Sequence, residues 1–379
     1  MFGKYRNKPI LITGIVLTVF PLILLKYINP FDALAAGLGI SFFTLQGISF
    51  LVDSYKGNAD SNISFLDYAI YMSFFPTISS GPIKRTDEFA SELNKKRAFD
   101  YDRVRSGLIK MGIGYVYKLI LADGLARAVS FVFDYKETLP SGAQILFATI
   151  LFGFQLFFDF AGYSDMALGI GKALGFTFNE NFDRPYRAAS LTEFWRRWHM
   201  SLTSWFKEYV YIPLGGSRKG ALRRDLNIMI VWALTGLWHG AGWNYVLWGL
   251  WFGVLLILEK RFLLNKKGYE KIPAILRRLL TYAAVLAGWS IFMGGDSALY
   301  LSLLGKNGTG DPAVLQKVLC MLPLLILCAG ISFLPSPKAE WLRKKSVRKA
   351  GFLCAALIFV LSLCFLCAKG YSPFVYFKF

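Results

Sequence analysis

The chain of 379 residues contains only two histidines, His199 and His239, and both follow a tryptophan. A neutral imidazole can accept the proton of a hydroxyl group near neutral pH. An ionisable side chain inside an apolar segment is a functional candidate by default, which favours His239. The alternatives are a packing histidine that bonds a backbone carbonyl for His239 and, for His199, an incidental place on an amphipathic interfacial helix over 190–211.

A second group of polar residues, Asp159, Tyr163 and Asp165, lies in the apolar run 143–175. Two unpaired carboxylates would be costly there. They therefore face a wet cavity or pair with Arg184, Arg187 or another cation, and we expect them to support a site rather than to perform chemistry.

Other chemistries lack their sequence patterns. There is no metal-ligand spacing, no phosphate-binding glycine loop and no Gly-x-Ser-x-Gly nucleophile motif. The five cysteines lie in or beside the last two apolar runs, where buried thiols are the simplest interpretation; they are Cys320, Cys328, Cys354, Cys364 and Cys367. We therefore expect no bound metal and no tightly bound cofactor.

The elements that must position these residues are membrane helices. Hydrophobic residues make up 55% of the chain, charged residues only 18%, and the mean hydropathy is +0.44. A helix that crosses the hydrocarbon core needs about 20 apolar residues. The apolar runs 10–25, 33–52, 65–75, 106–132, 143–175, 228–258, 279–292, 318–333 and 352–366 predict eight to ten membrane-embedded helices. We expect a single all-α domain over 1–379, multi-pass in the cell membrane and surrounded by lipid, with a re-entrant stretch near 76–82.

The net charge of +19 comes from Lys and Arg in short loops between apolar runs. Nucleic acid would require one contiguous basic face, so we do not expect it as a partner. Basic loops at 84–110, 218–224, 259–278 and 338–349 predict cytoplasmic positions. The segment 225–259 then forms a hairpin that turns at 240–242, which places His239 about 20 Å from Asp225 along the helix.

Several motifs in sequence order resemble the membrane-bound O-acyltransferase family, in its alginate O-acetyltransferase branch. They are Asp159-Phe160-Ala161-Gly162-Tyr163-Ser164-Asp165, Asn181-Phe182-Asp183-Arg184-Pro185-Tyr186, the segment 193–199, Tyr211-Ile212-Pro213-Leu214-Gly215-Gly216, Gly236-Leu237-Trp238-His239-Gly240 and the closing 372–377. The resemblance implies further helices before Met1 and a complete C-terminus. Met293 replaces the Arg that this branch usually carries.

The resemblance also implies a multi-helix fold with re-entrant segments and a central funnel, with His239 at its base and His199 in the same region. Residues expected to bind substrate or support the site lie in or beside the matched motifs; they are Asp159, Tyr163, Asp165, Asn181, Arg184, Trp195, Arg196, Trp198 and Trp238.

The implied reaction is the transfer of an acyl group, acetyl above all, from a thioester to a sugar hydroxyl. We expect His239 to act as general base and His199 to position a substrate or share the proton; a covalent acyl-enzyme is less favoured. The donor would be cytoplasmic acetyl-coenzyme A or an acyl carrier, the acceptor an extracellular polysaccharide, and a separate soluble protein could complete the transfer outside. Alternatives are D-alanyl transfer to teichoic acid, a transporter with His239 as proton relay, and a scaffold.

Overall fold

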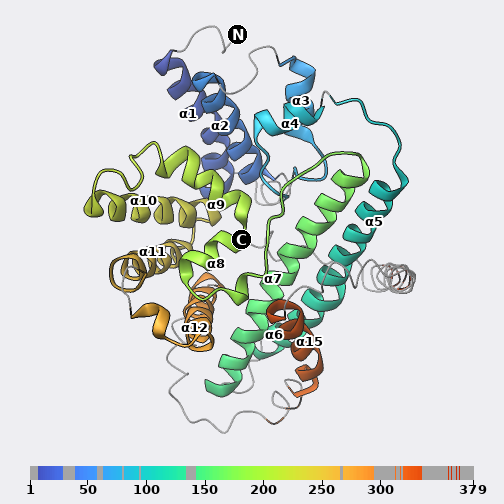
Figure 1. Cartoon of the computed structure of the whole chain (residues 1–379), viewed down its shortest axis with the longest axis vertical. Coiled ribbons are helices and arrows are strands. Elements are labelled where there is room, and N and C mark those ends of the chain that lie inside the picture. The colour runs from blue at the N-terminus through green and yellow to red at the C-terminus, as the bar shows by residue number, and fades with distance from the viewer. Residues whose placement is uncertain are drawn as a thin grey trace.

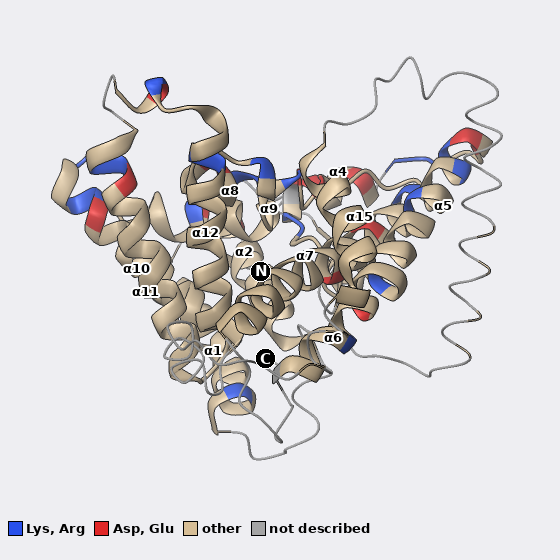
Figure 2. Ribbon diagram, turned by 90° about the horizontal axis from the view of Figure 1, so that it is seen from below, with Lys and Arg blue, Asp and Glu red and all other residues tan. Residues whose placement is uncertain are grey.

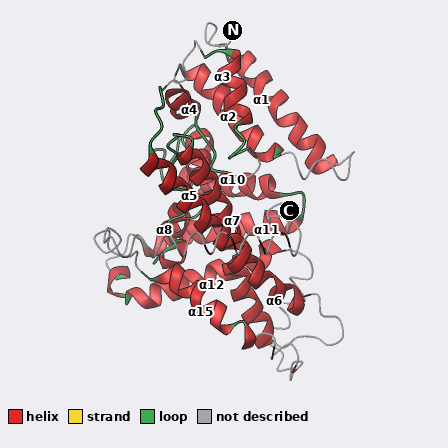
Figure 3. Cartoon of the chain, turned by 90° about the vertical axis from the view of Figure 1, so that its right-hand side faces the viewer, coloured by secondary structure: helices red, strands yellow, loops and turns green. Residues whose placement is uncertain are grey.

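The computed structural model describes residues 7–28, 39–57, 63–78, 81–93, 95–133, 142–264, 268–293 and 319–334, with isolated positions between 312 and 367. Every regular element in these ranges is a helix (Figure 3), so the expected all-α class is confirmed for them. The expected loop 338–349, Cys354 and the closing motif lie outside the described residues, as does most of the run 352–366.

Most α-helices lie in or overlap the predicted apolar runs, whereas those at 86–93, 191–197 and 200–206 lie outside them (Figure 1). The α-helices are α1 (Lys8–Ile23), α2 (Ile40–Lys56), α3 (Phe65–Ser73), α4 (Thr86–Leu93), α5 (Tyr101–Tyr115), α6 (Asp123–Phe133), α7 (Gly142–Ala173), α8 (Leu191–Arg197), α9 (Met200–Phe206), α10 (Ala221–His239), α11 (Trp243–Leu258), α12 (Ala274–Met293) and α15 (Leu322–Phe333). Short π-helical turns extend four of the described helices, at Leu24–Ile28, Val116–Ala122, Lys207–Tyr211 and Glu259–Leu263, and 3₁₀ turns lie at Pro185–Arg187 and Tyr269–Lys271.

Three described helical stretches are long and apolar enough to cross a membrane on their own: Lys8–Ile28, Gly142–Ala173 and Ala274–Met293. The second of these is α7, whose residues are mostly buried inside the protein, so α7 forms the core around which other helices pack. Between α3 and α4 the chain is not helical, yet Thr77, Ile83 and Lys84 are buried there.

The predicted hairpin is confirmed, because α10 ends at His239 and α11 begins at Trp243. Its open end is closed by Asp225, whose carboxylate pairs with Arg224 at 2.9 Å and with Arg261 from beyond α11. Figure 2 shows most of the charged residues along one edge of the molecule, near α4, α5, α8 and the open end of this hairpin, with a few others beside α6 and below α1. This common edge agrees with the placement of the basic loops on one side of the membrane.

The helices α5 and α7 run antiparallel at close range because glycines face each other. A Cβ added at Gly114 would lie 2.5 Å from the carbonyl oxygen of Gly162, and one at Gly169 would lie 2.6 Å from that of Gly107. Both pairs are seven residues apart along their helices, so the small residues form one continuous contact line. Small residues of this kind let membrane helices approach closely.

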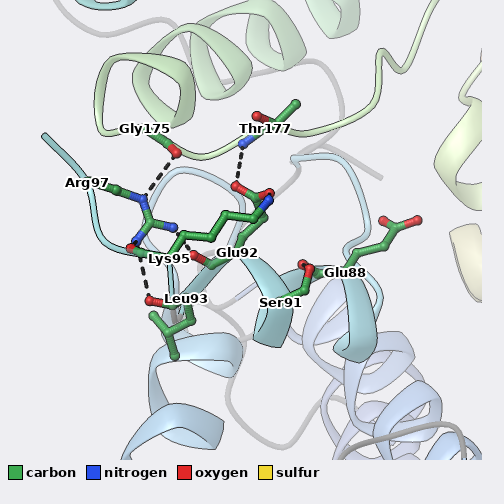
Figure 4. Close-up of polar contacts among 8 residues, drawn as sticks. All are labelled: Glu88, Ser91, Glu92, Leu93, Lys95, Arg97, Gly175 and Thr177. Carbon is green, nitrogen blue, oxygen red and sulfur yellow. Dashed lines mark hydrogen bonds and ion pairs between the residues drawn. The ribbon is translucent and has the colours of Figure 1, made fainter. Parts of the chain in front are cut away.

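The loop after α7 is fastened to the end of α4 by polar contacts (Figure 4). Arg97 Nε donates to the carbonyl oxygen of Gly175 at 3.1 Å, and the Thr177 N–H donates to the Glu92 carboxylate at 3.2 Å. Burial alone would raise the pKa of Glu92, but hydrogen bonds from Lys95 and Thr177 hold that pKa below its usual value. These contacts fix where α7 ends and where the loop that leads to Asn181 begins.

The prediction of one interfacial helix over 190–211 is wrong. The segment breaks into α8 and α9 at His199, whose φ of 44° is left-handed and unfavourable for a residue with a Cβ. Its aromatic residues Trp198, Trp205 and Phe206 are buried in the core. Burial of these rings against α2, α7 and α12 stabilises the break more than a continuous amphipathic helix at the surface would.

The glycine contact line can be tested on one helix. We expect Gly114→Ala to lower the thermal unfolding temperature in detergent, because its methyl group meets the Gly162 carbonyl. Gly112→Ala is the matched control, because a Cβ there meets nothing within 4 Å; alanine is about 1 kcal/mol better than glycine inside a helix, so this variant should be as stable as the parent or more so. Equal unfolding temperatures for the two variants would contradict the close approach.

Candidate functional site

Both histidines line one cavity of about 320 Å³ between the α8–α9 segment and helices α10, α11 and α12. Most of its wall is aromatic or aliphatic, while its polar lining consists of hydroxyls, imidazoles and cations. The aromatic lining residues are Trp195, Trp198, Phe206, Tyr211, Trp232, Trp248, Trp289 and Phe292. None of the described residues that line it is Asp or Glu.

His199 is held by a network centred on Asn181. Its Nδ1 lies 3.2 Å from Asn181 Oδ1, and that oxygen also accepts from the N–H and the hydroxyl of Ser201, at 3.1 and 2.9 Å. The Asn181 amide nitrogen donates to Ser164 Oγ on α7. Because Asn181 Oδ1 can only accept, Nδ1 of His199 must carry the proton.

The other ring nitrogen of His199, Nε2, then carries the lone pair. It is buried and has no hydrogen-bond partner among the described residues, although the side chain is only 3% exposed. A buried polar atom without a partner costs about 1–3 kcal/mol. The arrangement is therefore costly for folding alone and fits an atom that receives a hydrogen bond from a bound molecule.

His239 is the last residue of α10 and is 6% exposed. Its ring packs edge-on against Trp248 of α11 and Phe292 of α12, with centroid separations of 5.0 and 5.2 Å. Gly236 lets α11 approach, since a Cβ there would lie 2.4 Å from the Tyr245 carbonyl oxygen. The imidazole thus lies among rings from three helices, at the turn of the hairpin.

Three cations, Arg196, Lys207 and Lys260, line the same cavity. Burial and the nearby Arg224 and Arg196 lower the pKa of the Lys260 ammonium. Next to it, the buried Glu259 carboxylate accepts from the backbone N–H groups of Leu191 and Thr192 at 2.6 and 2.8 Å. This contact fixes the start of α8, the helix that carries Arg196 and leads to His199.

The structure brings together five of the predicted site residues in the cavity wall: His199, His239, Trp195, Arg196 and Trp198. Two more lie directly behind it, because Asn181 holds His199 and the Trp238 ring packs on His239 at 4.8 Å. The remaining four, Asp159, Tyr163, Asp165 and Arg184, do not line the cavity.

These outlying residues take part in packing contacts. Asp159 is paired with Lys118 at 2.6 Å and Asp165 with Lys110 at 3.0 Å, both across the α5–α7 contact or its continuation. The expected pairing is therefore present, with lysines in place of Arg184 or Arg187. Arg184, with a left-handed φ of 44°, donates to the Leu334 carbonyl, and Tyr163 is half-buried on α7.

Sequence reasoning missed Lys207, Lys260, Trp248, Trp289 and Ser201. Lys207 and Lys260 were indistinguishable from the other cations of basic loops, and Trp248 and Trp289 from lipid-facing aromatics. Ser201 carried a weak signal, as a hydroxyl two residues after His199. Among the described residues, no three His, Cys, Asp or Glu side chains are grouped as a metal site requires.

The buried pair Lys118–Asp159 yields a stability prediction. Lys118→Met removes the cation opposite a carboxylate that is 2% exposed, and loss of one partner of a buried pair typically costs about 3–5 kcal/mol. Lys118 also pairs with Asp123 at 2.9 Å, so the double variant Lys118→Met/Asp159→Asn should recover in detergent unfolding the part of that loss that comes from the unpaired Asp159. The pair Lys110–Asp165, at 25% and 20% exposure, is the matched control and should respond less to Lys110→Met. A double variant as unstable as Lys118→Met would contradict the coupling.

Comparison with known proteins agrees with this geometry. Residues 48–303 match the family model described as MBOAT, the membrane-bound O-acyltransferase family. The probable alginate O-acetylase of Pseudomonas putida is 31% identical, with an alignment that covers all of this chain and 81% of that protein. The peptidoglycan O-acetyltransferase of Helicobacter pylori is 32% identical over 90% of the chain and 74% of the relative.

Other relatives are matched over a smaller share of their length. The chain covers 48% of the probable alginate O-acetylase of Pseudomonas syringae pv. tomato, at 38% identity. It thus spans about half the length of several curated relatives. The match nevertheless includes both histidines and every element that lines the cavity. The chain therefore belongs to the membrane-bound O-acyltransferase family, and the expectation of an O-acyltransferase is confirmed at the level of the family.

Proposed function

We propose that the chain transfers acetyl groups from a cytoplasmic thioester towards hydroxyl groups of an extracellular polysaccharide. The observation that carries the proposal is the placement of both histidines in the wall of one cavity, with the tautomer of His199 set by Asn181. An apolar cavity with a few placed polar groups is the usual form of a small-molecule site.

His239 acts as general base in this proposal. As a sugar hydroxyl attacks the thioester carbonyl, the imidazole takes the hydroxyl proton, the new C–O bond forms and the C–S bond breaks. The same proton then passes to the departing sulfur, so that the products are an ester and a free thiol. His199 positions the acceptor, because its Nε2 can accept a hydrogen bond from a second hydroxyl.

The cations of the cavity wall support a phosphorylated donor. Coenzyme A and the prosthetic arm of an acyl carrier both hold their thioester at the end of a chain that bears phosphate. Arg196 belongs to α8, Lys207 follows α9, and Lys260 follows α11 in the loop 259–278, which is predicted to be cytoplasmic. Arginine and lysine bind phosphate through charge-assisted hydrogen bonds.

Acetyl is favoured over D-alanyl by the charge of the cavity. A relative, the teichoic acid D-alanyltransferase of Bacillus subtilis, is 30% identical over 70% of the chain. A D-alanyl group carries an ammonium, which a carboxylate would stabilise and a neighbouring cation would repel. The described lining residues provide three cations and no carboxylate, which suits a neutral acyl group. We further propose that the product is released outside the cell, where a separate soluble protein completes the transfer.

The general-base assignment gives a prediction on the two histidines. His239→Gln keeps a hydrogen-bonding side chain but cannot accept a proton near neutral pH, so polysaccharide acetylation should fall by about 10²- to 10⁴-fold at unchanged protein abundance. His199→Gln should cost less, about tenfold to a hundredfold, because it loses orientation rather than the proton acceptor. The measurement is mass spectrometry of the extracted polysaccharide, with the protein quantified by immunoblot.

The outcome distinguishes three assignments. Near-normal acetylation by His239→Gln would refute its role as base. A larger loss for His199→Gln than for His239→Gln would transfer that role to His199. Proton or solute flux in proteoliposomes without acyl turnover would favour the transporter alternative.

The donor assignment predicts an effect on KM. Lys260→Gln should raise the KM for an acetyl thioester about tenfold, with kcat little changed, because it removes binding that is equal in the ground and transition states. Lys219→Gln, at an exposed position just before α10 and outside the cavity wall, is the control and should behave as the parent. Added salt should narrow the difference between parent and Lys260→Gln. Equal KM values for the two variants would exclude Lys260 from donor binding.

A further inference from the structure

The C-terminal end of α10, next to His239, is held by two side chains that follow α1, near the N-terminus of the chain. Lys26, in the π-helical turn Leu24–Ile28 that ends the first membrane helix, donates from Nζ to the Trp238 carbonyl oxygen at 2.7 Å. The adjacent Tyr27 hydroxyl donates to the Leu237 carbonyl. These two carbonyls belong to the two residues that directly precede His239.

Both acceptors are carbonyls that α10 leaves open. The last four C=O groups of an α-helix have no partner within the helix, and α10 ends at His239. The hairpin then turns through Gly240 and Gly242, which have no side chain that could donate to these carbonyls. Without another donor, these carbonyls would stay unsatisfied in apolar surroundings, which would destabilise the last turn of α10.

The ammonium of Lys26 makes its polar contacts at the end of α10 and the start of α2. Its other polar contact is Ser41 Oγ at 3.4 Å, and it lies 5.9 Å from the centroid of the Trp238 ring. Within the described part of the chain, no carboxylate forms an ion pair with it. A half-buried lysine that contacts a helix end rather than an acid is costly to retain in an apolar segment, which indicates a specific use.

We propose that Lys26 is a positioning residue for acyl transfer, which holds the last turn of α10 and with it the imidazole of His239. The proposal rests on the proposed function, in which His239 accepts the proton. The positive charge of Lys26 has a second effect. The C-terminal end of a helix carries partial negative charge and favours the imidazolium form of His239, which cannot accept a proton. A cation at the Trp238 carbonyl offsets that field and favours the neutral ring.

The test compares three variants of the full chain in detergent or proteoliposomes. Lys26→Met keeps the length of the side chain without donor or charge; we expect kcat for acetyl transfer to fall about tenfold to a hundredfold with the donor KM within about twofold. Lys26→Arg keeps both donor and charge and should restore kcat to within about threefold of the parent. Lys8→Met makes the same substitution at the exposed start of α1 and should leave kcat unchanged.

A second measurement does not depend on activity. Hydrogen exchange of the peptide that covers the α10–α11 turn should be several-fold faster in Lys26→Met than in the parent, Lys26→Arg or Lys8→Met, because the last turn of α10 opens more often. If Lys26→Met does not fold, it is replaced by Lys26→Gln, which retains a donor without the charge. The kcat of Lys26→Gln should be lower than that of the parent but still measurable, and its exchange at the turn should be faster than in the parent.

The two proposals fail in different ways. An unchanged exchange rate at the turn in Lys26→Met, or a kcat within twofold of the parent in a folded variant, would overturn the role of Lys26 while leaving His239 as base. A fully active His239→Gln would refute the proposed base, and faster exchange in Lys26→Met would still establish that Lys26 holds the end of α10.

Discussion

Water is absent from the hydrocarbon core, so a buried polar group is stable there when it finds a partner within the protein, and His199 Nε2 is an exception that has none among the described residues. The carboxylate of Asp159 meets Lys118, the Asn181 amide meets Ser164 and the imidazole of His199, and the open carbonyls of α10 meet Lys26 and Tyr27. Each contact joins elements distant in sequence. The polar contacts thereby determine which helices meet, while the apolar surfaces alone would allow several arrangements.

The need to pair buried charges also separates the carboxylates of the molecule from the cations of the cavity wall. The buried carboxylate of Asp159 and the partly exposed one of Asp165 are paired with lysines between α7 and the α5 segment, away from the cavity. Glu259 is occupied by the start of α8. The cavity wall is left with cations, hydroxyls and imidazoles. A chain with a net charge of +19 can therefore present positive potential at this one site without losing its internal ion pairs.

Periodicity and composition predicted the helices and the α10–α11 hairpin because both follow from the length of apolar runs and the position of glycines. The same information predicted a role for His239, since a single imidazole at an apolar turn is unusual. It failed at 190–211, where the pattern of an amphipathic helix concealed a left-handed break at His199. That break is stabilised by tertiary contacts to Asn181 and to the rings of Phe160 on α7 and Phe42 on α2, which no local pattern contains.

Long-range contacts also explain why the sequence predicted that Asp159 and Asp165 are paired but did not identify their lysine partners. A charge within an apolar run predicts that a partner exists but does not identify it, and Lys118 is 41 positions away from Asp159. Lys26 illustrates the same limit, because its acceptor lies 212 positions further along the chain. Side chains that act on a distant backbone carbonyl leave no pairing pattern in a single sequence, since every residue provides a carbonyl. The residues that hold a membrane active site in place are therefore harder to identify from sequence than the residues that react in it.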